Sequence, residues 1–207
     1  MKYIKKIRAV LTGILIVTLF FTCFSVSAEE VVFEDINHND SIVLRSNSSI
    51  IELSISRVTQ MKSNWCWAAC AEMAGTCVSG SRKYQNYIVE YVFGDTGNYS
   101  ANDSQMLSAM SYAANGRSAS KTGVLSFAQI TNHLMQNKPI VGGFRYGLSK
   151  HLMVIHASRN PDFVKLIDPA TNTQFPNGRM EFYLSNLQSG YTYNGYYIKY
   201  TDSFVYN

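Results

Sequence analysis

The sequence lacks the motifs that most often reveal a cofactor or a bound ion. It has no Cys/His spacing typical of a zinc site, no glycine-rich loop that would cradle a phosphate and no EF-hand loop. It also lacks internal repeats, low-complexity tracts and a cell-wall sorting motif. We therefore expect no cofactor and no metal, and a function carried by the side chains of the chain itself.

Charge is also scarce. Charged residues make up 15% of the 207 residues, whereas 46% are hydrophobic, which suits one packed domain better than two. The N-terminal stretch MKYIKKIRAV holds four of the 18 basic residues and none of the 14 acidic ones, so the remainder carries 14 of each sign. No basic stripe for nucleic acid and no polybasic patch for a membrane surface remains. We expect neither nucleic-acid binding nor stable membrane association of the mature chain.

The first 28 residues have the pattern of a secretory signal peptide. Basic residues precede an apolar run, and the small residues of VSA (26–28) occupy the cleavage positions. The alternatives are a retained membrane anchor, because the run 9–24 is only slightly short of a spanning helix, and a lipoprotein anchor at Cys23. The change to acidic residues after Ala28 favours cleavage there and a secreted protein.

Residues 29–55 are the least domain-like part of the remaining chain. Acidic residues and Asn/Ser clusters surround two short apolar patches, VVF and IVL. This composition favours a leader or a short pro-segment, with an edge strand of the main domain as the alternative. Compact patterning begins near Arg57, so we predict a single domain over residues 56–207.

The domain changes character halfway along. Helical periodicity predicts helices over 65–75, 84–94, 104–115 and 126–137, with Gly75 ending the first and Asp103 or Ser104 and Ser126 as N-caps. Short β-branched and aromatic runs then predict strands over 138–147, 151–159, 163–170, 180–187 and 195–206. A helical half followed by a strand-rich half indicates an α+β fold. Gly142-Gly143, inside the first of these strands, is interpreted as making room for close packing.

Cysteine use points to a reactive thiol. Cleavage would leave Cys66, Cys70 and Cys77, an odd number in a secreted protein. Asn64 is a candidate N-cap that would place Cys66 in the first turn of a helix, where the helix dipole favours a thiolate. Burial of Cys66 and Cys70 on one helix face is the alternative. A Cys70–Cys77 disulfide is possible in this interpretation, because Gly75 can end the helix between them.

Gln60 precedes Cys66 by six residues and begins the segment QMKSN, which leads into WCWAAC. At that distance its amide can face the space above the sulfur. Together with the backbone N–H of Cys66 it is a candidate oxyanion donor.

A thiol nucleophile also needs a base, and His151 is the best-placed of four histidines. His38 and His133 are interpreted as structural or solvated, and His156 falls on the opposite face of the strand. Asp168 ends the next strand and precedes a proline. Antiparallel pairing sets the start of one strand beside the end of the next, so we expect Asp168 to orient His151, although turn formation is its alternative role.

The order Gln60, Cys66, His151, Asp168 resembles the papain-like cysteine peptidases, in particular the bacterial C39-like and AvrRpt2-like branch. NWCWAA with Gln six residues before Cys is the specific signal, and KHLMVI and LIDPA follow in the expected order. The resemblance implies a papain-like α+β fold, with the nucleophile Cys66 in the helical half and the base His151 and the orienting Asp168 in an antiparallel half. It also implies that Gln60 donates to the oxyanion. The plant-papain form C-G-S-C-W is absent, and Ser149-Lys150 precede His151 where the family often has glycine.

We therefore expect a secreted bacterial cysteine peptidase that acts on a peptide or protein substrate. Transfer of the acyl group to an amine, as in transglutaminase-like enzymes, uses the same three residues and stays an alternative. So does a secreted binding or toxin-like module that keeps the scaffold without peptidase activity.

Overall fold

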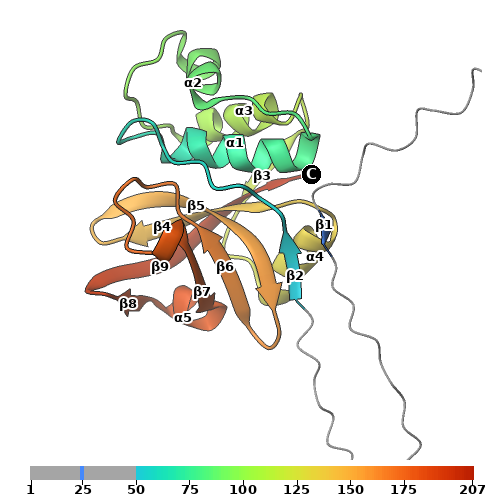
Figure 1. Ribbon diagram of the computed structural model, residues 1–207, viewed down its shortest axis with the longest axis vertical. Helices are drawn as coiled ribbons and strands as arrows, with labels where there is room; N and C mark the ends of the chain where they lie inside the picture. Colours follow the sequence, from blue (N-terminus) through green and yellow to red (C-terminus); the bar gives the residue numbers. More distant parts are fainter. Residues whose placement is uncertain (1–23, 26–49) are drawn as a thin grey trace, which may run out of the picture.

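The computed structural model describes residues 24–25 and 50–207 and arranges them in two layers (Figure 1). Helices α1, α2 and α3 lie together on one side, and most strands of a nine-stranded sheet lie on the other. The helices are α1 (Cys66–Ser79), α2 (Gln85–Phe93), α3 (Asp103–Ala113), α4 (Phe127–Met135), α5 (Leu184–Ser189) and a 3-10 turn, η1 (Pro176–Gly178). The strands are β1 (Phe24–Ser25), β2 (Ile50–Leu53), β3 (Ala119–Thr122), β4 (Ile140–Tyr146), β5 (Ser149–Arg159), β6 (Phe163–Ile167), β7 (Arg179–Tyr183), β8 (Tyr191–Tyr193) and β9 (Tyr196–Tyr206). The fold is α+β, as the sequence predicts.

The N-terminal border of the domain lies earlier than predicted. β2 pairs with β5, and Leu53 at the end of β2 and Ile55 just after it are buried in the core. Residues 50–53 therefore lie in the sheet, as the alternative of a strand would have it, and Leu53 and Ile55 pack into the core of the domain. The two residues of β1 pair with β2. Residues 1–23 and 26–49, with most of the predicted signal peptide, Cys23, His38 and the rest of the predicted leader, lie outside the described residues.

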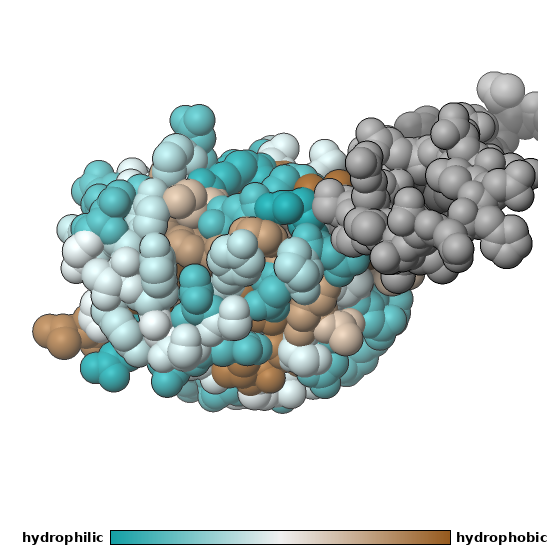
Figure 2. All heavy atoms as spheres, turned by 90° about the horizontal axis from the view of Figure 1, so that it is seen from below, coloured by the Kyte–Doolittle hydropathy of each residue, from teal (hydrophilic) through white to brown (hydrophobic). Residues whose placement is uncertain are grey.

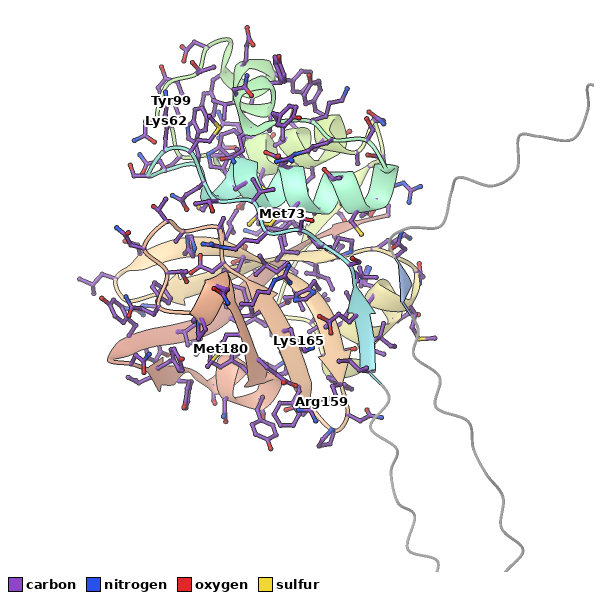
Figure 3. All side chains as sticks on the ribbon, viewed as in Figure 1. Lys62, Met73, Tyr99, Arg159, Lys165 and Met180 are labelled. Atoms are coloured by element: carbon purple, nitrogen blue, oxygen red, sulfur yellow. The ribbon has the colours of Figure 1, made fainter. Side chains whose placement is uncertain are left out.

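Helix α1 runs through Gly75, where the sequence predicted its end, and stops at Gly80 with φ 68°. Gly75 is needed for packing, because a Cβ there would lie 2.5 Å from the Cβ of Ala113 on α3. The glycine lets the two helices approach closely. Met73 lies on the opposite side, between α1 and the sheet (Figure 3), where its sulfur accepts the Val58 N–H at 3.3 Å.

The continuous helix also removes the possibility of a Cys70–Cys77 disulfide. Seven residues of helix separate the two thiols, a rise of about 10 Å, which is too long for a disulfide. In the described part of the chain, neither Cys66 nor Cys70 is in a disulfide. The Cys77 sulfur instead lies 3.6 Å from Asn137 Oδ1.

Two of the helices begin with a capping box. Ser126 caps α4, as predicted, and exchanges hydrogen bonds with Gln129. The cap of α3 is Asn102 rather than Asp103 or Ser104, because its side chain accepts the N–H of Gln105 while the Gln105 side chain accepts the N–H of Asn102.

The sheet centres on β5, which pairs antiparallel with β2, β4 and β6. β4 pairs on its other side with β9, and the register shifts between Gly143 and Phe144. Gly143 has no room for a side chain because the Asp202 carboxylate lies there, and a Cβ on Gly142 would lie 2.6 Å from the Phe144 ring. The double glycine thus makes room for close packing, as interpreted from the sequence.

The segment predicted as a strand over 180–187 is divided between β7 and helix α5. The helix starts after Tyr183, where Leu184 N–H donates to Asp162 O at 2.7 Å, and Leu184 and Leu187 turn into the core. Figure 2 shows the sheet end of the molecule as mostly hydrophilic or intermediate, with hydrophobic residues in a band across its middle and one group projecting at the left edge. Among the described residues, we find no helix with the length and apolar character to span a membrane.

Candidate active site

Cys66 is the first residue of α1, so its sulfur lies at the positive end of the helix dipole. Trp65 and Trp67, which flank it, are buried. Their indole N–H groups donate to the carbonyls of Gly97 and Tyr99 at 2.9 and 3.0 Å. The two tryptophans therefore fasten the loop after α2 to the head of α1 and hold the cysteine between them, partly exposed.

Asn64 does not cap α1, contrary to the sequence prediction. Trp65 occupies the N-cap position without a side-chain cap, because the Asn64 amide donates to Asn98 O and the Asn64 N–H donates to Asn98 Oδ1, both at 3.0 Å. Figure 3 shows Lys62 and Tyr99 together at this end of the helical layer, and the Lys62 ammonium lies 4.9 Å from the Trp65 ring centroid. Cys66 still lies in the first turn of α1, and the N-terminus of this helix has no side-chain cap.

His151 and Asp168 lie side by side, as antiparallel pairing predicts. Val154 on β5 pairs with Ile167 on β6, so His151 near the start of β5 faces the residue that follows β6. The Nε2 atom of His151 is 2.6 Å from Asp168 Oδ1. This leaves Nδ1 to face Cys66, whose thiol lies close enough for the imidazole to lower its pKa.

The three groups shift one another's protonation. Burial alone would raise the pKa of Cys66, but the hydrogen bond and charge of His151, with the backbone N–H groups of Leu152 and Trp67, lower it. Burial would lower the pKa of His151, yet the bond to Asp168 and then the bond and charge of Cys66 raise it to about 9. The lowered pKa of the Cys66 thiol and the raised pKa of the His151 imidazole both favour the pair of a thiolate and an imidazolium.

Cys70 differs from Cys66 although it lies one helical turn away. It is fully buried, and burial together with the negative charges of Cys66 and Asp168 raises its pKa well above the usual value. Only Cys66 of this pair combines exposure with a stabilised thiolate.

Asp168 begins a loop that holds its carboxylate from several sides; we call residues 168–178 the Asp168 loop. Oδ1 also accepts the Ala170 N–H at 2.8 Å, and Oδ2 accepts the hydroxyl of Thr173. The Arg57 guanidinium donates to the carbonyls of Asp168 and Ala170 at 2.7 and 2.5 Å. Burial would raise the pKa of Asp168, but His151, then Thr173 and Ala170, hold it below its usual value.

Gln60 lies next to the Asp168 loop, to which its backbone N–H is bonded through Pro169 O at 2.8 Å. Its side chain is buried, and Nε2 donates to the carbonyls of Lys62 and Ser63 at 3.0 and 2.7 Å. In this conformation both N–H protons of the Gln60 amide are therefore donated to carbonyls of the segment before Cys66. The role of oxyanion donor stays a prediction that requires Gln60 to release one of these carbonyls.

Gln85, which the sequence did not single out, holds the backbone on both sides of Gln60. Its buried amide donates to Thr59 O at 2.9 Å and accepts the Met61 N–H at 3.0 Å. The Gln85 N–H is bonded in turn to the buried carboxylate of Glu72 at 2.9 Å. A glutamine at the start of a helix carries no sequence signal for this role, because the contact joins segments that only the fold brings together.

A groove of about 610 Å³ runs past Cys66 and His151 between the two layers. The helical side contributes Ser63, Asn64, Trp67, Ser100, Ala101, Asn102, Asp103 and Met106. The sheet side contributes Tyr146, Ser149, Lys150, Leu152, Ala170 and Phe204. The mixed apolar and polar lining of the groove suits a peptide.

The other described histidines lie away from the thiol. His156 is buried in the sheet, 3.2 Å from Leu53 O and 3.3 Å from the Arg179 guanidinium, and burial lowers its pKa to about 4. His133 lies on α4, where burial lowers its pKa. Over residues 50–207, no three His, Cys, Asp or Glu side chains gather closely enough to hold a metal ion.

A helix that carries a cysteine at its head, packed on an antiparallel sheet that carries the histidine, defines the papain-like class of thiol enzymes. The chain belongs to the Peptidase_C39 like family, whose model matches residues 52–199. The family and the fold together support a cysteine peptidase. The matched range also includes residues 52–55, which the structure places in the domain.

Two solved structures are similar to this chain at low sequence identity. One is a putative C39-like peptidase from Bacillus anthracis, with a TM-score of 0.51, 9% identity, and coverage of 77% of this chain and 98% of that one. The other is a double glycine motif protease from an AMS/PCAT transporter, solved with a leader peptide, with a TM-score of 0.46, 13% identity, and coverage of 72% and 93%. No curated protein matches the chain.

Proposed function

We propose that this protein is an exported cysteine peptidase that hydrolyses peptide bonds through Cys66, His151 and Asp168. The observation that carries the proposal is the unbroken series of contacts from the Cys66 thiol through the His151 imidazole to the Asp168 carboxylate, set at the wall of the groove. A thiolate and a proton donor present at the same pH are what acyl transfer from an amide requires.

In the proposed reaction the Cys66 thiolate attacks the scissile carbonyl carbon, and the electron pair of the C=O bond moves to oxygen. His151 then gives its Nδ1 proton to the leaving nitrogen as the C–N bond breaks, which leaves a thioester on Cys66. Water attacks the thioester while His151 takes a proton from it. The C–S bond breaks, the carboxylic acid leaves and the thiolate returns.

The oxyanion needs donors at the head of α1. The Cys66 backbone N–H is one candidate, because the first N–H groups of a helix have no acceptor within it. Gln60 is the second candidate if its Nε2 leaves the Lys62 carbonyl, the longer of its two bonds at 3.0 Å. The exchange replaces one hydrogen bond by a stronger one to a charged oxygen.

Acyl transfer to an amine remains the second candidate, since an amine and water compete for the same thioester. A binding module on the same scaffold is the third, and it predicts an unreactive Cys66. Product mass separates the first two, and thiol reactivity separates both from the third.

The test is the intact mass of the secreted protein after treatment with an epoxide inhibitor of thiol peptidases. We expect one adduct on the wild type, none on Cys66→Ala and a strongly reduced yield on His151→Ala. The mass of the untreated secreted chain also locates its N-terminus, which the predicted cleavage places at Glu29.

Cys70→Ala is the matched control, because Cys70 lies one turn away and is buried. The adduct should persist in this variant. Absence of an adduct on folded, reduced wild type would favour the binding module, and a chain retained in the cell with its first 28 residues would contradict export.

A further inference from the structure

The two oxygens of the Asp168 carboxylate accept hydrogen bonds from different donors. Oδ1 faces two donors, the His151 imidazole at 2.6 Å and the Ala170 N–H at 2.8 Å. Oδ2 faces a single donor among residues 50–207, the hydroxyl of Thr173. Because Asp168 is 1% exposed, water cannot readily replace that donor.

The direction of the Thr173 hydroxyl proton is fixed by its surroundings. The hydroxyl oxygen accepts the Phe175 N–H at 3.2 Å, so its one proton is free to point at Asp168. Phe175 is buried, and its carbonyl accepts the Gly178 N–H at 2.8 Å. The Gly178 carbonyl accepts the Asp168 N–H at 2.8 Å. The Asp168 loop therefore closes on itself and holds Thr173 in place.

Building on the proposed peptidase function, we propose that Thr173 is a positioning residue. Its hydroxyl fixes the rotation of the Asp168 carboxylate, so that Oδ1 stays on the His151 imidazole and the other ring nitrogen stays on the Cys66 sulfur. Without the hydroxyl, the buried Oδ2 has no donor, and the carboxylate turns away from His151 to find one. The substrate never needs to touch Thr173.

Other charged or titratable groups near Asp168 approach from different directions. Arg57 donates to the backbone carbonyl of Asp168, not to its carboxylate. Cys70 lies on α1 within reach of the Asp168 charge, and the Tyr146 ring on β4 lies 6.0 Å from the His151 ring on β5.

Lys150, beside His151 on β5, is paired instead with Asp202 at 2.7 Å. Thr173 is thus the group whose removal changes the Asp168 carboxylate and leaves these other charges in place.

The test measures the His151 titration directly, by NMR of the imidazole, in the full mature chain and in Thr173→Val. The hydrogen bond to Asp168, with the hydrogen bond and charge of Cys66 and the charge of Asp168, raises the pKa of His151 to about 9 against the effect of burial. A misaligned Asp168 carboxylate should therefore move the His151 midpoint to lower pH. We also expect alkylation of Cys66 at neutral pH to slow about tenfold, the loss that one hydrogen bond to a charged group corresponds to.

Three further variants separate positioning from folding. Thr173→Ser keeps the hydroxyl and should retain the wild-type midpoint, and Thr171→Val makes the same change at an exposed position of the same loop and should leave it unmoved. Thr173→Ala should reproduce the shift, and it replaces Thr173→Val if that variant does not fold. Thermal unfolding of each variant shows which of them are folded.

The outcomes distinguish the two proposals. A raised His151 midpoint in the wild type that persists in folded Thr173→Val and Thr173→Ala would overturn the positioning role alone. An ordinary His151 midpoint and an ordinary, slowly alkylated Cys66 in the wild type would overturn the proposed function, and the role of Thr173 with it.

Discussion

At the scale of single residues, Cys66 and His151 act as one titrating unit. The thiolate raises the pKa of the imidazole, and the imidazolium lowers the pKa of the thiol. Burial opposes both charges, so the thiolate depends on the imidazolium, and the imidazolium depends on Asp168 as well as on the thiolate. The reactive form exists between the two pKa values.

This coupling predicts a bell-shaped dependence of kcat/KM on pH with a fluorogenic peptide. Activity should rise as pH passes the lowered pKa of Cys66, because the thiolate forms, and fall as pH passes about 9, because His151 loses the proton that the leaving amine needs.

Asp168→Asn removes the charge that supports the imidazolium but keeps an oxygen for Nε2, so its alkaline limb should move to lower pH. An alkaline limb that stays in place would show that Asp168 orients His151 without affecting its charge.

Part of this arrangement could be predicted from the sequence. A histidine at the start of one strand and an aspartate at the end of the next become neighbours in any antiparallel pair, so His151 and Asp168 follow from order alone. Thr173 and Gln85 could not be predicted, because their contacts depend on how a loop turns and on which helix lies beside it. Asn64 was misassigned as the cap because its amide reaches a loop from another part of the chain.

At the scale of elements, α1 combines two tasks. Its head presents Cys66, and its body is the centre of the helical layer, where it crosses α3 at Gly75. The sequence predicted the helix but not its length. A glycine such as Gly75 can either end a helix or make room for a neighbouring helix, and the sequence alone does not distinguish the two. Likewise, the aromatic pair Phe182 and Tyr183 and the apolar residues around it favoured one strand over 180–187 and hid the short helix α5.

Gly75→Ala tests the close crossing. The added Cβ would lie 2.5 Å from the Ala113 Cβ and 2.7 Å from its carbonyl carbon, so α1 and α3 must separate. Overpacking of this kind costs about 1–3 kcal/mol, against a gain of about 1 kcal/mol in helix propensity. We expect a net loss of stability in urea denaturation.

The double variant Gly75→Ala with Ala113→Gly should recover part of this loss, because it removes the Cβ contact and keeps the backbone one. A Gly75→Ala protein more stable than wild type would mean that the two helices tolerate a wider spacing.

At the scale of the whole molecule, the N-terminal segment 50–60 joins the two layers. β2 lies on the sheet, and Glu52 pairs with Lys165 at 2.6 Å; Figure 3 shows Lys165 within the sheet layer. Further along, Arg57 and Gln60 bind the Asp168 loop before the chain enters α1.

A chain that begins at residue 50 should therefore fold, whereas one that begins at residue 56 should be markedly less stable. The shorter chain loses the buried side chains of Leu53 and Ile55, worth about 1.5–3 kcal/mol each, out of a typical total of about 5–15 kcal/mol. Thermal unfolding of the two chains is the measurement. Equal melting temperatures would show that residues 50–55 do not stabilise the domain, and would support their assignment to the leader.

The division of the site between the layers has a consequence for the timing of activity. The proposed nucleophile, Cys66, is at the head of a helix in the first half of the chain, whereas His151 is on β5 and Asp168 follows β6 in the second half. Under the proposed function, a chain that is unfolded during synthesis or export has no imidazole beside Cys66. The reactive pair forms only when β5 and the Asp168 loop pack against α1, so an unfolded chain would carry an ordinary thiol and no stabilised thiolate.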